Sequence, residues 1–455
     1  MLKNLFKKKM KNLFIILLSI VLIETNKNIP RKLKEPDDPP GPPPSGGGDT
    51  SYDYTDYKAN VTDQNLDKDE YISTTSDQSV AYVTKSGIKF NGTTLTKASG
   101  DSSNIENSEF FGVNAAVLVQ GGELNVIGGT ITTKAKGANA LCVTNNGKLT
   151  ISGTKIISTA ESSARGLHAT YGGEIKATAV DISSIGGSCA NLATDRGEGV
   201  VTCTGCVLST AGAGSPLIYS TGKITVSETT GSATGAQMVV VEGKNTATVE
   251  NGSNLKCYGI GNRNNIDNCG VMIYQSMSGD AADGTGTYNC KASTMAISKE
   301  SPIYDSAPMF FVTNTKAVIN LEDCILDYNH GTFLDIKGTS EWGNSGSNGG
   351  EVTLNLNNQE IEGDIVVDGI SSLSIVMINS SIKGKINNKK TASKLSITLD
   401  SKSKITLTGD SYYTSLTNAE SSGKNIDKGS YTFSQYTSSG SLIKFSMLLL
   451  LFSLF

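Results

Sequence analysis

The sequence predicts an all-β chain that folds as a parallel β-helix, a solenoid of about eleven coils between residues 79 and 410. Short apolar segments recur at residues 116–119, 140–143, 166–169, 190–193 and 216–219, with starts 24, 26, 24 and 26 residues apart. Each is followed by a segment of alternating apolar and polar residues, such as 123–127 and 148–151, which is the period of a half-buried strand. Turns rich in glycine and asparagine separate the segments, and these residues tolerate sharp bends.

One such repeat cannot bury its own apolar face, so neighbouring repeats must stack. The series continues at 238–241, 271–274, 309–312, 332–335 and 365–368, and an early member lies at 80–83. A propeller needs about 40 residues and four strands per repeat, and leucine-rich repeats need a strict Leu/Asn frame. Neither fits this spacing. The pattern resembles the right-handed parallel β-helix proteins of the pectin-lyase-like fold, especially the adhesin-like surface proteins among them.

The parts that flank the repeat have different compositions. Residues 1–25 join a basic start to an apolar run at 13–23 and predict a signal peptide, with retention as an uncleaved anchor as the alternative. Residues 26–50 form a Pro/Gly-rich linker, and the acidic residues 51–78 are expected either to cap the first coil or to be disordered. Residues 411–441 are a Ser/Gly/Thr-rich spacer before a hydrophobic tail at 442–455.

An apolar tail behind a polar spacer is the pattern of a glycosylphosphatidylinositol (GPI) signal. In a eukaryotic source the lipid would attach at Gly429 or Ser430; in a bacterium the tail would need another explanation. Signal and tail together predict a location on the extracellular face of the cell surface, with the membrane contacted through the anchor. Four Asn-x-Ser/Thr sequons are candidate glycosylation sites, at Asn60, Asn91, Asn251 and Asn379.

The chain has eight cysteines, and in a secreted chain an even number favours disulfides. Cys257 and Cys269 flank a Gly/Asn-rich excursion and are the pair predicted to close a loop, with buried unpaired thiols as the alternative. Cys203 and Cys206 form the only C-x-x-C of the sequence. Without a second such pair this motif does not define a zinc site.

The formal net charge of −4 and the lack of basic clusters beyond the N-terminus argue against a nucleic-acid partner. The resemblance implies that an enzyme of this fold would carry clustered Asp with Arg or Lys, and the polygalacturonase motifs are missing. Asp335 and Asp368 end two aligned apolar strands. If those coils stack directly, the carboxylates would lie about 5 Å apart. That spacing suits a retaining glycosidase or a calcium ion, and an ordinary solvated pair is the alternative; no other cofactor is predicted.

Several first strands of the repeat are apolar throughout, including Val239 with Val240 and Phe310 with Phe311. Only alternate residues of a strand face the core, so one of the two columns must leave an apolar stripe on the outside. Such a stripe is either a contact surface or is covered by the chain's own loops or termini. We expect self-covering or self-association ahead of a foreign ligand. His168 falls in these strands, where a packed or outward-facing ring is expected.

These features predict a cell-surface adhesin-like or scaffold protein that displays a rod for contact with carbohydrate, another cell or its own copies. The alternative is a secreted polysaccharide lyase or glycoside hydrolase that acts on pectin-like polymers. The lack of matching catalytic motifs favours the first.

Overall fold

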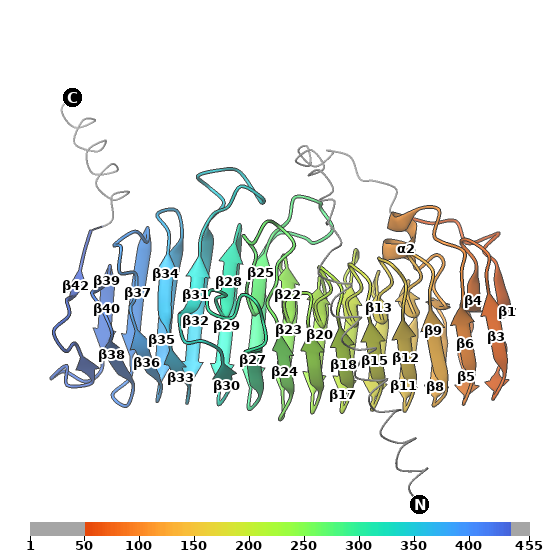
Figure 1. Ribbon diagram of the computed structural model, residues 1–455, viewed down its shortest axis with the longest axis horizontal. Helices are drawn as coiled ribbons and strands as arrows, with labels where there is room; N and C mark the ends of the chain where they lie inside the picture. Colours follow the sequence, from red (N-terminus) through yellow and green to blue (C-terminus); the bar gives the residue numbers. More distant parts are fainter. Residues whose placement is uncertain (1–50, 438–455) are drawn as a thin grey trace, which may run out of the picture. The chain divides into compact units, whose positions relative to one another are not determined.

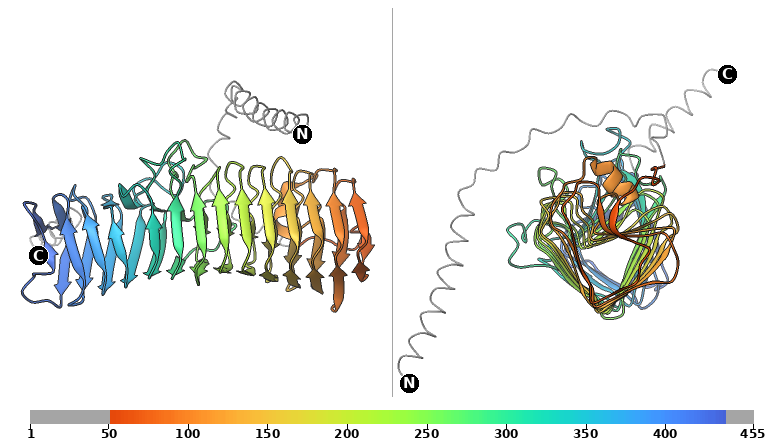
Figure 2. Two further views of the ribbon diagram at one scale, coloured as in Figure 1. Left: turned by 60° about the horizontal axis from the view of Figure 1, so that its bottom comes forward. Right: turned by 90° about the vertical axis from the view of Figure 1, so that its right-hand side faces the viewer.

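The computed structural model describes residues 51–437, which form a parallel β-helix whose coils stack in sequence order (Figure 1). Viewed along the stack, the coils superpose into a three-sided outline (Figure 2). We call the three long sheets A, B and C. Sheet A has twelve strands, namely β1 (Ala59–Thr62), β4 (Ser79–Val83), β7 (Val117–Gln120), β10 (Leu141–Thr144), β13 (Leu167–Ala169), β16 (Leu192–Thr194), β19 (Ile218–Ser220), β22 (Val239–Glu242), β25 (Val271–Tyr274), β28 (Phe310–Thr313), β31 (Thr332–Ile336) and β34 (Asp364–Val367).

Sheet B is the longest sheet of the described residues, with fourteen strands. They are β2 (Leu66–Asp67), β5 (Ile88–Asn91), β8 (Glu123–Ile127), β11 (Lys148–Ser152), β14 (Glu174–Thr178), β17 (Val200–Thr204), β20 (Lys223–Ser227), β23 (Thr246–Glu250), β26 (Thr285–Lys291), β29 (Thr315–Glu322), β32 (Gly350–Asn357), β35 (Ser372–Ile378), β37 (Lys394–Leu399) and β40 (Ser415–Asn418). Its burial alternates residue by residue, so one side faces the core and the other faces outward.

Sheet C contains ten strands, namely β3 (Glu70–Ser73), β6 (Thr94–Lys97), β9 (Thr130–Thr133), β12 (Lys155–Ser158), β15 (Asp181–Ser184), β18 (Val207–Thr210), β21 (Thr230–Ala233), β24 (Asn254–Cys257), β27 (Thr294–Ile297) and β30 (Ile325–Asp327). The remaining strands form a four-stranded sheet of β33 (Glu360–Glu362), β36 (Ser381–Gly384), β38 (Lys404–Leu407) and β41 (Ile426–Asp427) and a pair of β39 (Ser411–Tyr413) and β42 (Phe433–Gln435). One short helix, α2 (Ile105–Phe111), interrupts the strands of the described residues.

The solenoid is longer than the sequence predicted. Residues 51–78 contain β1, β2 and β3, which pair with the second coil. Residues 411–437 contain β39 to β42, which continue the stack. The apolar segments of these end coils are short and their turns polar, which hid them from a search for apolar repeats. No helix among residues 51–437 is long and apolar enough to cross a membrane.

The corner that follows the sheet B strand of a coil repeats one backbone conformation. In twelve successive coils the first residue after the sheet B strand has φ between 46° and 64°. Four of these residues are glycines and the others are Lys68, Ala179, Glu228, Asn251, Ala292, Asp323, Asn358 and Asn379. This left-handed conformation is strained for most residues with a Cβ. A buried residue follows at the corner, as in Thr229 and Ser380, and its side chain accepts a backbone N–H of the preceding coil.

Replacing Ala179 by glycine is therefore expected to stabilise the protein by about 1 kcal/mol, because glycine adopts a positive φ without strain. The φ of Ala179 is 50°. The reverse change at Gly153, whose φ is 60° and whose added Cβ would meet nothing within 4 Å, is expected to destabilise by a similar amount. Urea unfolding of both variants measures the two effects. Equal stability of Gly153→Ala and the unmodified protein would contradict this strain argument.

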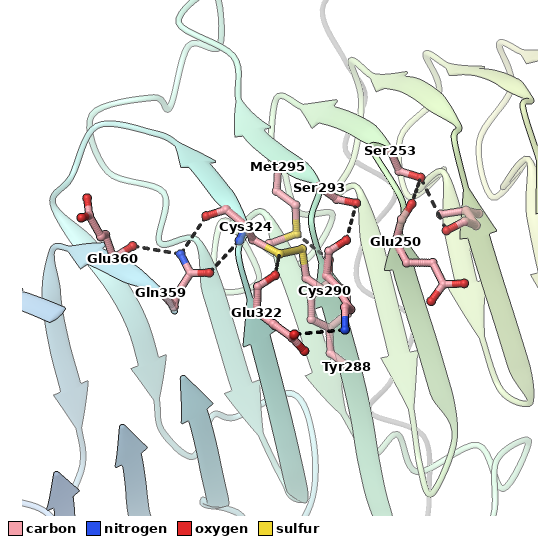
Figure 3. The surroundings of a disulfide bond; sticks show 12 residues. Glu250, Ser253, Tyr288, Cys290, Ser293, Met295, Glu322, Cys324, Gln359 and Glu360 are labelled. Atoms are coloured by element: carbon pink, nitrogen blue, oxygen red, sulfur yellow. Dashed lines mark hydrogen bonds and ion pairs between the residues drawn. A yellow bond between two sulfur atoms is a disulfide. The ribbon is translucent and has the colours of Figure 1, made fainter. Parts of the chain in front are cut away.

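The disulfide of the described residues joins Cys290 of β26 to Cys324, which lies in the following coil at the corner between β29 and β30 (Figure 3). The Cα–Cα distance is 6.5 Å. The predicted pair was wrong, because Cys257 and Cys269 are both unbonded and buried. Cys257 belongs to the core inside the coils, whereas Cys269 packs with a separate cluster outside sheet A. The wall of the β-helix lies between the two side chains, and sequence spacing alone does not reveal it.

Candidate functional site

The outer face of sheet A carries the apolar column that the sequence predicts, and other parts of the chain cover it. Register places Tyr219, Val240, Met272 and Phe311 one above another on this face. Val240 is 6% exposed and Phe311 is 1% exposed. Their neighbours Val239 and Phe310 belong to the inner core. The stripe is therefore not an exposed contact surface, and the self-covering alternative describes it.

Near the N-terminal end the cover is aromatic. Tyr54 donates to the carbonyl of Phe111 at 2.7 Å, and Tyr57 hydrogen-bonds Ser79 at 2.7 Å. Helix α2 is capped at its start by Asn104, whose side chain accepts two backbone N–H groups, and at its end by a left-handed Gly112. The helix lies on the outside of the coils (Figures 1 and 2). These segments bury the column where Leu118 and Cys142 stand.

An ionic cluster fixes the middle of this cover. Arg165 lies 3.3 Å from Glu109 of α2 and 3.3 Å from Asp195, and both Arg165 and Asp195 are buried. Arg196 contacts Asp280 at 2.7 Å, and its guanidinium carbon lies 3.8 Å from the centre of the Phe110 ring. Oppositely charged groups thus connect α2, the loops after β16 and a later excursion. Removing one partner of a buried ion pair destabilises the fold strongly, because the other charge is left buried without a partner.

Two ionisable groups beneath this cover have displaced pKa values. His168 is fully buried and neither ring nitrogen has a hydrogen-bond partner in the described structure. Burial and then the charge of Arg165 place the pKa of His168 well below its ordinary value. Burial raises the pKa of Asp195 to about 7, although Arg165 acts in the opposite direction. Between pH 7 and 4 the folded chain binds a proton at Asp195 that the unfolded chain does not, so this group increases stability as the pH falls. Below pH ~6.5 the unfolded chain binds a proton at His168 that the folded chain does not, so this group decreases stability as the pH falls.

Replacing His168 by leucine is expected to remove an acid-sensitive contribution to folding. Below pH ~6.5 the unfolded chain binds a proton that the buried ring does not, which costs about 1.4 kcal/mol of stability per pH unit. The stability of His168→Leu relative to the unmodified protein should therefore rise by about 1 kcal/mol between pH 6.5 and 5.5, where the unfolded histidine is only partly protonated. Urea unfolding at several pH values measures this slope. His330, the other histidine, is exposed, and His330→Ala serves as the control without such a gain.

Further along the same face, a buried carboxylate is held by hydroxyl groups. Glu242 is 1% exposed and accepts from Tyr219 at 2.5 Å, from Tyr274 at 2.8 Å and from Ser276. Trp342 packs edge-on against Tyr274, with ring centres 5.2 Å apart. The excursion at residues 338–349, which the sequence marks only by its tryptophan, thus covers this part of sheet A.

The predicted pairing of Asp335 with Asp368 was wrong. Asp335 is in register with Phe311 on one side and Val366 on the other, so Asp368 lies two residues beyond the register position, just after the end of β34. Asp335 pairs with Lys337 at 2.7 Å, and Asp368 accepts the backbone N–H of Gly338 at 2.9 Å. An alignment by last apolar residue cannot see this shift. No group of three or more potential metal ligands occurs among residues 51–437.

The outer face of sheet B, in contrast, carries polar side chains in register that reach solvent. Asn289 donates to Thr248 at 3.1 Å, Asn320 donates to Asn289 at 2.8 Å, and Asn355 donates to Asn320 at 2.8 Å. These side chains are half-exposed. Stacked amides of this kind leave part of their hydrogen-bonding capacity for a ligand. In the sequence this row of polar residues is visible at the outward positions of the alternating strands. The repeat itself is predicted from the inward apolar positions alone.

A shallow depression of about 290 Å³ lies on this face, lined by Gly87, Ile88, Lys89, Glu123, Leu124, Asn125, Lys148 and Thr150. Register sets Lys89 beside Asn125, and Asn125 beside Thr150. Glu123 lies 3.9 Å from Lys148, and both side chains are more than half exposed. The depression therefore presents two ammonium groups, an amide, a hydroxyl and a carboxylate within three neighbouring strands.

The four sequon asparagines are all exposed. Asn91 ends β5, and Asn251 and Asn379 occupy the left-handed position of the corner between sheet B and the strand that follows; Asn60 lies in β1.

The candidate lipid-attachment residues Gly429 and Ser430 lie between β41 and β42. Cleavage there would remove β42, which pairs with β39. The predicted signal peptide, linker and hydrophobic tail lie outside the described residues.

The fold and this face define a class: a parallel β-helix protein whose sheet A is covered by its own loops and whose sheet B is open and polar. Comparison with protein-family models, with curated proteins and with solved structures finds no match to this chain.

Proposed function

We propose that this chain is a cell-surface adhesin-like or scaffold protein of the pectin-lyase-like kind, and that the outer face of sheet B contacts carbohydrate. The observation that carries the proposal is the contrast between two faces. From β4 to β28 the outer face of sheet A is buried beneath N-terminal tyrosines, α2 and later excursions, whereas sheet B presents half-exposed polar side chains and the depression around Asn125.

The chemistry of the depression suits a sugar polymer with carboxylate or sulfate groups. Lys89 and Lys148 offer ammonium donors to an anion, and Asn125 and Thr150 offer an amide and a hydroxyl to sugar hydroxyls. Glu123 accepts from hydroxyl donors and disfavours a ligand that places an anion beside it. An open site of this size makes few contacts, so tight attachment would rely on many copies at a surface, which raises avidity without new contacts.

Location at the extracellular surface is part of the same proposal. The N-terminal signal would export the chain and a lipid would retain it, while glycans at exposed asparagines would border the display face. Asn91 lies two residues after Lys89 on the same strand, so a glycan at Asn91 would narrow access to the depression. Asn91→Gln is expected to increase binding if that site is occupied.

A glycan array probed with the full chain tests this function. Binding to acidic glycans is expected, with a loss of tenfold or more in the double variant Lys89→Ala/Lys148→Ala. Lys155→Ala is the matched control, because Lys155 is an exposed lysine in the same coil as Lys148 but on sheet C. The absence of any glycan binding would overturn the carbohydrate proposal. Release of unsaturated uronides from pectin by the purified chain would favour the lyase alternative instead.

A further inference from the structure

The C-x-x-C motif brings two thiols together at the corner between sheets B and C. Cys203 is the fourth residue of β17 and points into the core, and Cys206 follows at the corner; they are 0% and 1% exposed. Gly205 between them has a φ of 63°, the left-handed conformation with which the chain turns from β17 to β18. The Cys206 thiol donates to the carbonyl of Thr204 at 3.7 Å. Each thiol shifts the pKa of the other, raising that of Cys203 and lowering that of Cys206, so the two groups lie close together.

The Cys290–Cys324 disulfide uses the same two columns of positions, although its two cysteines come from adjacent coils. Register links Cys203 to Val226, Val226 to Val249, and Val249 to Cys290. Cys290 is in turn in register with Leu321, and Cys324 lies three residues after Leu321, as Cys206 lies three residues after Cys203. Both pairs thus place one sulfur in the same core column and one in the same corner column.

The alternative role for Cys206 is that of a hydrogen-bonding corner residue. In that role the side chain accepts a backbone N–H of the preceding coil, as Thr229 Oγ1 accepts the N–H of Cys206 at 3.3 Å and Ser380 accepts the N–H of Gln359 at 3.0 Å. A hydroxyl would serve that role alone. The two adjacent coils place Ala177 and Val226 at the core position of Cys203, so neither position requires sulfur for packing.

We propose that Cys203 and Cys206 form a second disulfide, within a single coil. A disulfide oxidant such as oxidised glutathione supplies the chemistry. The Cys206 thiolate attacks one sulfur of the oxidant and releases one glutathione thiolate. The Cys203 thiolate then attacks the Cys206 sulfur of the mixed disulfide and releases the second. The two cysteines lose two protons and two electrons, and the oxidant is reduced to two thiols.

Both sulfurs are buried, so exchange takes place before the coil closes or during its local opening. The bond would fix the corner between β17 of sheet B and β18 of sheet C.

Peptide mapping of the full chain tests the proposal. The reduced, unfolded chain is refolded in a mixture of reduced and oxidised glutathione, acidified, and alkylated under denaturing conditions before trypsin cleavage. The peptide 197–223 contains Cys203 and Cys206 and no other cysteine. It is expected to lack both alkyl groups and to weigh two hydrogen atoms less than the dithiol form. The linked peptides of Cys290 and Cys324 report that oxidation has gone to completion.

Two variants exclude protection by residual structure. In Cys206→Ser the hydroxyl retains the corner role, and Cys203 is expected to become fully alkylated; in Cys203→Ser the same is expected of Cys206. Cys257 and Cys269 should be alkylated in every sample. Alkylation of both Cys203 and Cys206 in unmodified protein whose Cys290–Cys324 bond is closed would overturn the proposal.

Discussion

Replacing Phe311 by aspartate is expected to destabilise the protein by about 4 kcal/mol or more. Phe311 is 1% exposed on the outer face of sheet A, where it packs with Val240, Met272 and Trp342. Truncating a buried phenylalanine alone costs about 3–5 kcal/mol, and a buried carboxylate adds a desolvation cost. Lys337, whose Nζ lies 5.3 Å from the ring centre, would offset only part of it. Urea unfolding measures the loss.

The matched control is Ile325→Asp. Ile325 begins β30 and is 65% exposed, so the change should alter stability by no more than about 0.5 kcal/mol. Because each coil contacts mainly its neighbours, amide hydrogen exchange should show the damage of Phe311→Asp in β25, β28 and β31. Equal effects of the two substitutions would show that the outer face of sheet A is open and that its cover is loose.

Replacing both Cys290 and Cys324 by alanine is expected to lower stability by about 4 kcal/mol. The bond closes a segment with a sequence separation of 34 residues, and a cross-link of that span removes this much conformational freedom from the unfolded chain. Thermal or urea unfolding with and without reductant measures it. Reductant should destabilise the unmodified protein strongly and the double variant much less.

The control for this prediction is Cys257→Ala/Cys269→Ala, which removes two buried unbonded thiols. That variant loses packing but no cross-link, so its response to reductant should match that of the unmodified protein. A stability of the unmodified protein that does not change when the Cys290–Cys324 bond is reduced would contradict the prediction.

The repeat predicted the fold because the inward columns are apolar in nearly every coil, as Leu124, Leu149 and Ile175 illustrate. The ends of the solenoid escaped prediction, since β39 to β42 are rich in serine, threonine and tyrosine. A strand pattern in such segments emerges only when the preceding coil offers backbone partners.

The candidate sites were less predictable, because they depend on register and on what covers a face. A shift of two residues separates Asp335 from Asp368. The burial of His168 depends on α2 and the ionic cluster, which are formed by residues distant in sequence. The depression beside Lys89 requires three strands from separate coils. None of these arrangements follows from a single repeat read in isolation.

The most direct test of the central claim is amide hydrogen exchange of the full chain with and without an acidic glycan selected on the array. Ligand contact at the open face predicts slower exchange in β5, β8 and β11, and unchanged exchange in α2 and residues 338–349. Slower exchange confined to α2 and residues 338–349, with sheet B unaffected, would place the ligand on sheet A and contradict the account.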